Sequence, residues 1–489
     1  MLLSAEAHLL ATDVPVVRLG ALPLLFVDDS GVATRTGVVP TLHPARTRRA
    51  PVLQADQPWE GERVYVYGSV YHDEPTGEFR LWYGSRPSQE LAGRSSPTGA
   101  APYLRNKGFD LTLYATSTDG LNWRKPALGR VEYAGSKQNN ILFDFHSPSV
   151  LRDEREIDPA KRFKMLGYLV RPSHAYHAAY SADGIVWHDY PKSAVLEHGD
   201  TITLAQHPGT GEYLAYHKRP AEVRGLGRRV IWLSRSRDFQ QWSEPELVFA
   251  PDEQDDNWVS RPRERTEVYN MSVYPHAAGF VGLPAVFRVM QETPRDKTGP
   301  GQSPVDGPID IQLVTSFDGR IWQRRLPRVS LIPRGAPGDF DAGTILGVTS
   351  TPVHTPSETW VYYTAINTGH GGPMPPKRIT IGRAEWRRHG FVSLDAGPDG
   401  GRVETVPLHI VGDRLHVNAD AAAGELRIGL LDTDSRPIAG FAIEDCVPLR
   451  ADATAFVAQW EKRERLPRDR PVRVVLELRN TRLYSVSAP

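Results

Sequence analysis

The sequence contains one cysteine, Cys446, among its 489 residues. A single cysteine excludes an intramolecular disulfide framework and places no redox constraint on the compartment. An excess of charge of one sign is also lacking, because 58 basic and 58 acidic residues cancel. Without a net field, the chain has no general attraction for nucleic acid or for an anionic membrane surface. We therefore expect a small-molecule or oligosaccharide substrate as its partner.

Long apolar runs and cofactor motifs are absent as well. The N-terminus, MLLSAEAHLLATDVPVV, has no basic segment and no long apolar core, and no 18-residue apolar run occurs elsewhere. The sequence has no H-E-x-x-H, cysteine cluster, P-loop or dinucleotide glycine fingerprint. These absences predict a soluble, cytoplasmic protein that needs no metal and no cofactor. They leave the oligomeric state open, with a homo-oligomer as one alternative.

A seven-residue pattern, Ser-x-Asp-Gly-x-x-Trp, recurs along the chain. Its copies are STDGLNW (117–123), SADGIVW (181–187), SRDFQQW (236–242), in which Phe replaces Gly, and SFDGRIW (316–322). Each copy follows a segment rich in aromatic and β-branched residues, which is typical of a strand. We interpret the pattern as a hairpin turn in which Ser and Asp bind backbone N–H groups and Gly supplies a positive φ. Its Trp would begin the outgoing strand.

The pattern belongs to a larger repeat of strand-like segments. Two such segments precede each copy, and a fifth unit has Arg388-His389-Gly390-Phe391 in place of the pattern. Five units of four strands predict a five-bladed β-propeller. After residue 398, apolar and polar residues alternate between closely spaced turns, which predicts a β-sandwich. The predicted fold is therefore all-β, with an N-terminal extension packing on the propeller (1–60), a propeller catalytic domain (61–398) and a sandwich (399–489).

Several segments carry a resemblance to a known family. They are DGLNWRKPALGRVEYAGSKQNNILF, DPAKRFKMLGY, HGFVSLDAG and LYSV. They resemble bacterial proteins described as similar to the N-terminal propeller of family-32 glycoside hydrolases, in the superfamily of five-bladed propeller glycosidases of families 32, 43 and 68. The resemblance spans nearly the whole chain. It implies a sugar-processing site at the propeller axis, built from carboxylates on the innermost strands.

The motifs of invertases and fructanases are altered in this chain. W-M-N-D-P-N-G is absent, with Asp28-Asp29 as the nearest acidic pair, and R-D-P survives only as Arg152-Asp153 followed by Glu154. The E-C motif is missing, because Cys446 lies in the predicted sandwich. The first inner strand, residues 63–73, has no carboxylate until its far end. We therefore expect a furanoside or an uncommon oligosaccharide as substrate, rather than sucrose or a fructan.

Carboxylates at the starts of the predicted inner strands are the candidate catalytic groups. Glycoside hydrolysis uses one protonated and one ionised carboxyl group, roughly 5 to 10 Å apart. When the second strands are aligned, Asp200 and Glu267 occupy the same position in neighbouring units. We predict that Glu267, protonated beside another carboxylate, is the general acid and that Asp200 is the nucleophile or base. Turn roles are the alternative for both, and Asp341 and Asp153, at other strand ends, are further catalytic candidates.

Aromatic and polar side chains are expected to complete the sugar site. The candidates that would stack on a sugar ring are Tyr67, Tyr269 and Trp258, and those that would hold hydroxyl groups are His146, Asn270 and Arg261. Each also fits a purely structural role.

Two other functions fit the same scaffold. The first is a sialidase-like hydrolase, although the repeat is one residue shorter than the sialidase Asp-box and the Phe-Arg-Ile-Pro signature is absent. The second is a non-catalytic carbohydrate-binding propeller, because propellers often serve as binding platforms. The matched acidic positions, Asp200 and Glu267, favour catalysis.

Overall fold

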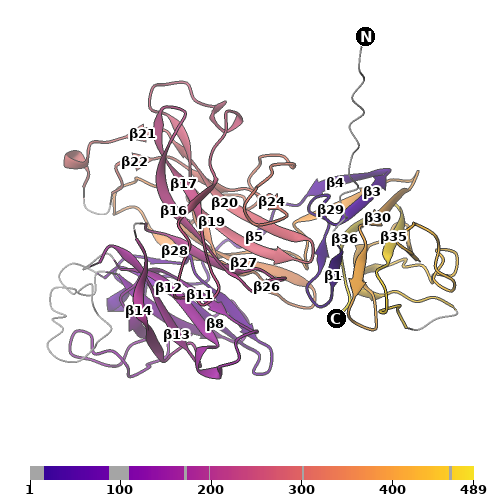
Figure 1. Ribbon diagram of the computed structural model, residues 1–489. Coiled ribbons are helices and arrows are strands. Elements are labelled where there is room, and N and C mark those ends of the chain that lie inside the picture. The colour runs from indigo at the N-terminus through magenta and orange to yellow at the C-terminus, as the bar shows by residue number, and fades with distance from the viewer. Residues whose placement is uncertain (1–15, 88–109, 170–172, 198, 300–301, 462–464) are drawn as a thin grey trace, which may run out of the picture. The chain divides into compact units, whose positions relative to one another are not determined.

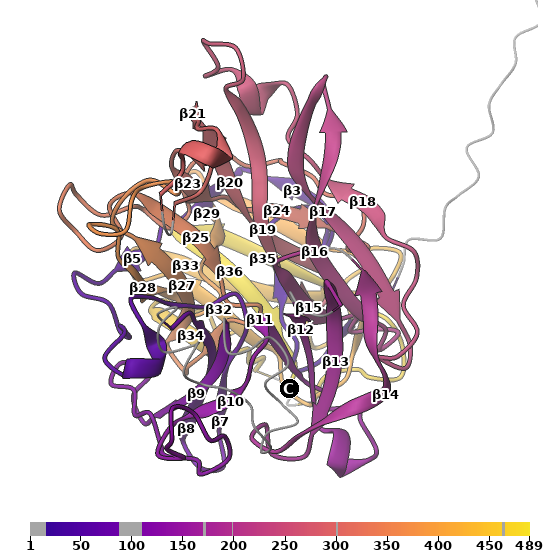
Figure 2. The same cartoon turned by 90° about the vertical axis from the view of Figure 1, so that its left-hand side faces the viewer.

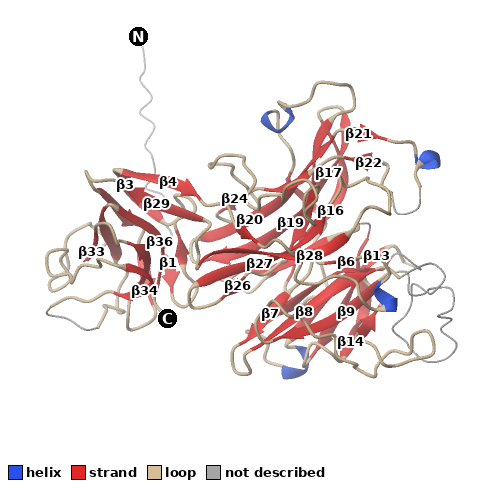
Figure 3. Cartoon of the chain, turned by 180° about the vertical axis from the view of Figure 1, so that it is seen from behind, coloured by secondary structure: helices blue, strands red, loops and turns tan. Residues whose placement is uncertain are grey.

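The computed structural model describes residues 16–87, 110–169, 173–197, 199–299, 302–461 and 465–489. Strands form nearly all of its regular structure (Figure 3), which confirms the predicted all-β class. Its helical segments are short 3₁₀ turns at Pro58–Glu60, Pro159–Lys161, Gln254–Asp256 and Arg295–Lys297. None of the helices in the described ranges is long and apolar enough to span a membrane.

The chain divides into two compact units. The larger comprises residues 42–275 and 279–391, and the smaller comprises residues up to Thr41, 276–278 and 392–489. In the described part of the larger unit, five sheets of four or five strands follow one another along the chain (Figures 1 and 2), and we number them 1 to 5. The five repeat units of the sequence are therefore present as five sheets.

The strands of sheets 1 to 3 are as follows. Sheet 1 contains β6 (Val64–Tyr65), β7 (Val70–Asp73), β8 (Glu78–Ser85), β9 (Leu111–Ser117) and β10 (Ile141–Phe143). Sheet 2 contains β11 (His146–Arg152), β12 (Phe163–Leu169), β13 (Ala175–Ser181) and β14 (Trp187–Glu197). Sheet 3 contains β15 (Ile202–Gln206), β16 (Tyr213–Val223), β17 (Leu226–Ser236) and β18 (Glu246–Phe249).

Sheets 4 and 5 complete the larger unit. Sheet 4 contains β19 (Arg265–His276), β20 (Gly279–Val289), β23 (Ile309–Ile311) and β24 (Val314–Ser316), and a small sheet of β21 (Gln291–Glu292) and β22 (Val305–Asp306) is inserted after β20. Sheet 5 contains β25 (Thr344–Val348), β26 (Val353–His354), β27 (Glu358–Ile366), β28 (Ile379–Arg387) and, from the N-terminal part of the chain, β5 (Arg46–Thr47).

Hydrogen bonds link the first strands of the five sheets, or residues beside them, into a closed cycle. The linked pairs are Ser69 with Val150, Ser149 with Leu204, Thr203 with Met271, Ser272 with Val348, and Ser350 with Gly68. Each pair joins one sheet to the next, and the last pair joins sheet 5 back to sheet 1. Because the pairs join strands at matching positions, the N-terminal ends of the first strands lie together.

The seven-residue pattern forms the turn that the sequence predicts. In the second copy, the Asp183 carboxylate accepts hydrogen bonds from the backbone N–H groups of Ile185 and Val186, each at 2.8 Å. In the other copies, the carboxylates of Asp119, Asp238 and Asp318 accept the same two bonds from the backbone. The residue after each Asp has a φ of 65° to 76°, and in the third copy Phe239 takes this conformation in place of glycine.

Three of the four turns also fasten their sheet to a neighbour. Trp82 of sheet 1 donates a hydrogen bond to the Gly184 carbonyl of sheet 2 at 2.8 Å. Tyr216 and Tyr362, on sheets 3 and 5, donate equivalent bonds to the turns of sheets 4 and 1. In the turn of sheet 3, the Phe239 carbonyl accepts a bond from Trp242 of the same turn. The contacts of the pattern are therefore structural.

Replacing the turn aspartate should weaken the fold. We expect Asp183→Ala to lower the free energy of unfolding by about 1 to 2 kcal/mol, because the backbone N–H groups of residues 185 and 186 lose their acceptor. Denaturant titration of the purified variant measures the change. Glu154→Ala in the same sheet, which removes an exposed carboxylate from surface ion pairs, is the control and should change stability much less. Equal effects of the two substitutions would contradict this role.

The smaller unit contains two main sheets that share one core. The first has the order β34 (Asp452–Val457), β32 (His416–Asp420), β36 (Thr481–Ser487), β29 (Val392–Ala396) and β4 (Val38–Leu42), with β2 (Leu24–Leu25) also paired to β36. The second has the order β3 (Val32–Thr36), β30 (Gly401–Thr405), β35 (Arg473–Arg479) and β33 (Glu425–Leu431). A further pair joins β1 (Val17–Leu19) and β31 (Leu408–Ile410) in parallel. Fully buried Val403, Val417, Leu476 and Leu483 bring both main sheets into one hydrophobic core.

The described part of the predicted N-terminal extension (1–60) is divided between the two units. Strands β2, β3 and β4 pair with C-terminal strands of the smaller unit, whereas residues 42–60 belong to the larger unit, where β5 joins sheet 5 and Leu53 forms a bridge with Ile381. The boundary between the units also falls at Val392 rather than after residue 398, because β29 pairs with β36. Local sequence does not reveal these pairings, since each joins segments more than 80 residues apart.

Candidate functional site

Asp200 is the centre of a charged cluster at the N-terminal ends of the first strands. It lies two residues before β15, and its side chain is 41% exposed. One carboxylate oxygen is 2.7 Å from His146 Nε2, and the other is 2.6 Å from Lys218 Nζ. The Tyr176 hydroxyl accepts the Asp200 backbone N–H at 2.8 Å. The predicted candidates Asp200 and His146 are therefore in direct contact.

His146, the first residue of β11, extends the cluster toward sheet 1. Its Nδ1 is 2.9 Å from the Tyr65 hydroxyl and 3.5 Å from the carboxylate of Asp110, which pairs with Arg86 at 2.8 Å. Burial lowers the pKa of His146, but the carboxylates of Asp110 and Asp200 outweigh burial and raise that pKa to about 9. His146 is therefore an imidazolium at neutral pH.

Lys218 joins Asp200 to sheet 4. It lies on β16, its side chain is buried, and its Nζ is 3.6 Å from the centre of the Tyr269 ring. Burial raises the pKa of Asp200, but the Lys218 ammonium and the hydrogen bond to His146 outweigh burial and hold that pKa well below its usual range. Asp200 is therefore an ionised carboxylate that stays accessible to solvent, which suits a nucleophile or a general base.

The surroundings of Glu267 differ from those expected of a general acid. It lies near the start of β19, as expected, but its side chain is only 2% exposed. Arg229 contacts one carboxylate oxygen at 2.5 Å and Arg265 contacts the other at 2.7 Å. No second carboxylate among the described residues contacts it. Both oxygens of Glu267 are engaged by guanidinium groups, which leaves neither of them open toward a glycosidic oxygen in this structure, so the role of proton donor stays a prediction.

Tyr67 and Asn270 lie beside the cluster. The Tyr67 ring centre is 6.4 Å from that of His146, and burial raises the pKa of Tyr67 well above its usual value, so the phenol is neutral. Asn270 is buried, and its Oδ1 has no hydrogen-bond partner among the described residues. A Cβ at position 347 would lie 3.0 Å from Tyr67 and 3.4 Å from Asn270 Oδ1, so Gly347 leaves space at both side chains. Tyr67, Tyr269 and Asn270 therefore stay candidates for substrate contacts.

Asp153 does not belong to the cluster. It follows β11 at the opposite end from His146, and seven residues of strand span roughly 23 Å. Its carboxylate is 3.0 Å from Lys164 Nζ and 2.5 Å from the Tyr213 hydroxyl, and both Asp153 and Lys164 side chains are only 2% exposed. Asp153 is therefore one half of a buried structural ion pair, which corrects its place among the catalytic candidates.

Asp341 lies three residues before β25, at the same end of the first strands as Asp200. The Tyr363 hydroxyl of β27 donates a hydrogen bond to its carboxylate at 2.7 Å, and no direct contact with Asp200, His146 or Lys218 occurs among the described residues. Burial raises the pKa of Asp341, and the hydrogen bond from Tyr363 opposes that rise only in part. Asp341 therefore stays a catalytic candidate.

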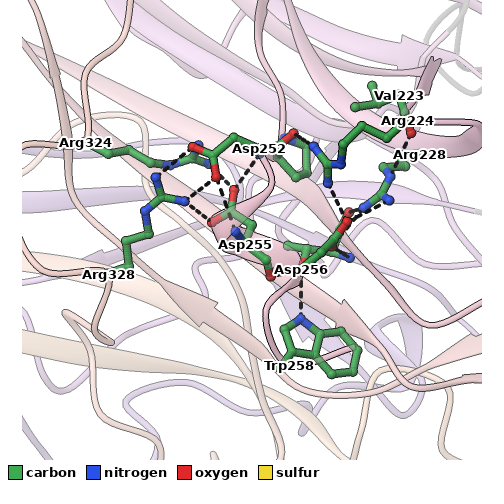
Figure 4. A network of polar contacts seen from close by, with 11 residues as sticks. Val223, Arg224, Arg228, Asp252, Asp255, Asp256, Trp258, Arg324 and Arg328 are labelled. Atoms are coloured by element: carbon green, nitrogen blue, oxygen red, sulfur yellow. Dashed lines mark hydrogen bonds and ion pairs between the residues drawn. The ribbon is translucent and has the colours of Figure 1, made fainter. Parts of the chain in front are cut away.

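Trp258 lies at the edge of another network, shown in Figure 4. The network joins Asp252, Asp255 and Asp256 to Arg224, Arg228, Arg324 and Arg328. The Trp258 indole N–H donates to the Thr266 hydroxyl at 2.9 Å, and the Thr266 backbone N–H donates to Asp256 at 2.8 Å. The exposed Arg261 pairs with Glu264 three residues on, outside this network. Among the described residues neither side chain contacts the cluster around Asp200, so their substrate-binding roles stay predictions.

Sequence reasoning missed the cations that define the site. Lys218, Arg229 and Arg86 hold Asp200, Glu267 and Asp110, respectively. The sequence carried one signal, namely that Lys218 and Arg229 interrupt the strand-like segments YLAYHKR and RRVIWLS. Charged residues within such strands are rarely buried unless they are paired. Within the described residues, no group of three or more His, Cys, Asp or Glu side chains could hold a metal ion.

The comparisons with known proteins do not assign a family. No protein-family model and no curated protein matches the sequence. Solved structures that match include an N-acetylgalactosamine deacetylase from F. plautii in complex with blood group B trisaccharide, at 14% identity over 72% of this chain and 96% of that chain, with a TM-score of 0.42. A β-1,2-mannobiose phosphorylase from Listeria innocua matches at 12% identity over 70% and 96%, with a TM-score of 0.41.

A fructofuranosidase variant from Schwanniomyces occidentalis, complexed with fructosylnystose, matches at 10% identity over 89% of this chain and 96% of that chain, with a TM-score of 0.40. Other matching structures are glycoside hydrolases, the class that the sequence resemblance implies. Similarity at this level does not assign an activity, so the function has to follow from the site itself.

Proposed function

We propose that this protein is a glycoside hydrolase, with a five-bladed β-propeller as its larger unit and a β-sandwich as its smaller unit. The propeller is supported by five consecutive sheets whose first strands are linked in a closed cycle. The sandwich is supported by two sheets that share one core. In this arrangement, the cluster around Asp200 lies where the inner strands begin.

One observation carries the proposed activity. Asp200 is an ionised carboxylate that is 41% exposed and is oriented by two cations, His146 and Lys218. Beside it are the aromatic ring of Tyr269, which packs on Lys218, and the ring of Tyr67 near His146. An oriented carboxylate with aromatic side chains nearby suits attack at the anomeric carbon of a sugar. We assign Asp200 the role of nucleophile or general base.

His146 replaces Glu267 as the proposed proton donor. It is a cation at neutral pH and contacts Asp200, whereas Glu267 is enclosed by Arg229 and Arg265. In hydrolysis, its Nε2 proton would pass to the glycosidic oxygen as the carbon–oxygen bond breaks. An acid and a nucleophile act on opposite sides of that bond and need roughly 5 Å between them. The proposal therefore requires the substrate to open the 2.7 Å contact between His146 and Asp200.

A second candidate function is carbohydrate binding without catalysis. The observation that favours it is the enclosure of Glu267 by two arginines, which leaves Asp200 without contact to another carboxyl group among the described residues. Binding needs only the aromatic rings and the polar groups, including the unpaired Oδ1 of Asn270.

Turnover assays on a defined panel separate the two functions. The purified protein is incubated with sucrose, inulin, levan, and aryl furanosides and pyranosides, and the released sugar and aryl alcohol are measured. We expect release from an aryl glycoside and little release from sucrose or a fructan. Binding of a glycoside without any turnover would favour the non-catalytic function, and rapid release of fructose would contradict the expected specificity.

The pKa of His146 predicts an alkaline limit to activity. If the imidazolium donates the proton, kcat/KM should fall about tenfold per pH unit above pH 9, because the acid form of the free enzyme is lost as the pH rises through its pKa of about 9. The pH profile of kcat/KM on an active aryl glycoside measures this limit. NMR titration of the His146 ring, assigned with His146→Asn, is the direct control. An imidazole that titrates near pH 6.5, or a flat profile to pH 10, would contradict the assignment.

A further inference from the structure

Arg229 presents a guanidinium group beside the proposed reaction site. It lies on β17, and its guanidinium carbon is 5.5 Å from the centre of the Tyr269 ring and 5.8 Å from that of Phe287. The same Tyr269 ring packs against Lys218, which holds Asp200. One aromatic ring therefore connects Arg229 to the reacting carboxylate.

Buried groups hold Arg229 in place without using all its donors. Glu267 accepts one of its N–H groups at 2.5 Å, and Arg265 fixes the other oxygen of Glu267. Among the described residues, Arg229 has no other hydrogen-bond acceptor, and its side chain is 28% exposed. A guanidinium group has five N–H donors in a rigid plane that matches two carboxylate oxygens. Arg229 is therefore oriented and keeps donors available for a ligand.

The two ion-pair networks around this point carry an excess of positive charge. They contain six cations, His146, Lys218, Arg86, Arg229, Arg263 and Arg265, and four carboxylates, Asp110, Asp200, Glu267 and Glu292. Asp110 and Glu267 are buried beneath their cations. The excess lies on Arg86 and Arg263, whose side chains are 43% and 78% exposed and screened by solvent, so the oriented Arg229 is the cation that an anionic group would meet at this point.

We propose that the site takes an acidic sugar, a glycoside whose ring bears a carboxylate, and that Arg229 binds that carboxylate. This inference rests on the proposed function and adds the substrate class. Arg229 would determine the specificity, and Glu267 and Arg265 would position it. The Tyr269 ring would lie between the sugar carboxylate at Arg229 and the anomeric carbon at Asp200.

Binding of matched sugars tests the inference. Methyl glucuronides and methyl galacturonides are compared with the corresponding methyl glucosides and galactosides, which lack only the carboxylate, and with inorganic phosphate as a free anion. Affinities are measured by saturation-transfer NMR and calorimetry on the wild type, Arg229→Met, Arg229→Lys and the control Arg320→Met, which removes an exposed arginine paired with Glu246. Thermal unfolding of each variant is recorded, because Arg229→Met leaves Glu267 with one partner.

We expect at least one uronide to bind more tightly than its neutral counterpart. Its affinity should fall at least tenfold in Arg229→Met and less in Arg229→Lys, and it should stay unchanged in Arg320→Met. Equal binding of neutral and acidic sugars by the wild type would overturn the inference even if the variants fail to fold. So would binding of phosphate without any uronide, or binding of none of the probes. If the protein still cleaves neutral aryl glycosides in any of these three cases, the proposed function holds and only the acidic substrate class is wrong. If it does not cleave them, both the proposed function and the substrate class are wrong.

Discussion

Asp200→Asn is expected to lower kcat by about 10³-fold or more on any glycoside that the wild type cleaves, because an amide can neither attack the anomeric carbon nor accept a proton from water. The substitution preserves the shape of the side chain, and Asp200 is 41% exposed, so the fold should be retained. Steady-state kinetics and thermal unfolding of the purified variant measure the two quantities separately. A large loss of kcat in a variant that stays folded at the assay temperature is the result that the assignment requires; a lower unfolding temperature is expected, because the buried Lys218 loses its carboxylate partner.

A matched control for this substitution is Asp413→Asn. Asp413 is an exposed carboxylate in the smaller unit and forms a surface ion pair with Arg468 at 3.0 Å. Its replacement should leave both kcat and stability near the wild-type values. Near wild-type turnover of Asp200→Asn would exclude Asp200 as the reacting group. If the wild type binds a glycoside and never cleaves it, Asp200→Asn should instead weaken that binding, as the non-catalytic alternative predicts.

Asp153→Ala is expected to lower the free energy of unfolding by about 1 to 3 kcal/mol and to leave kcat unchanged. The reason is that the buried Lys164 would lose Asp153 and keep Glu156, at 2.8 Å, as a carboxylate partner, and the Tyr213 hydroxyl would lose its acceptor. Denaturant titration measures the loss of stability. Activity assays well below the unfolding temperature measure kcat.

The double variant Asp153→Leu with Lys164→Met identifies the cause of that loss. It replaces the buried pair by apolar side chains of similar volume, so much of the stability should return if the loss of Asp153 as a partner of the buried Lys164 is responsible. A loss of kcat without a loss of stability in Asp153→Ala would mean that the carboxylate acts in catalysis, and the structural role would be wrong.

The sequence predicts the local features of this protein because they depend on neighbouring residues. The hairpin turn of residues 181–187 needs only Ser181, Asp183 and a residue with positive φ, and all are adjacent in the chain. The five sheets follow from the repetition of such turns at similar intervals. The contact between Asp200 and His146 agrees in part with the sequence prediction, which places both residues in one sugar site.

The electrostatic surroundings of each carboxylate were not predictable in this way. Glu267 and Asp200 were predicted at equivalent positions. Arg229 and Arg265 enclose Glu267. Lys218 and His146 bind Asp200 but leave it exposed. Arg229 is 38 residues from Glu267, so their contact depends on how sheet 3 packs beside sheet 4.

The all-β class and the turns could therefore be predicted from local sequence, because periodicity and turn chemistry depend on neighbouring residues. The packing of the chain makes Asp200 the accessible carboxylate and buries Asp153 against Lys164. The pairing of β2, β3 and β4 with C-terminal strands depends on packing as well. The physical reason is the same in each case, since burial and charge pairing depend on side chains that only packing brings within a few ångströms.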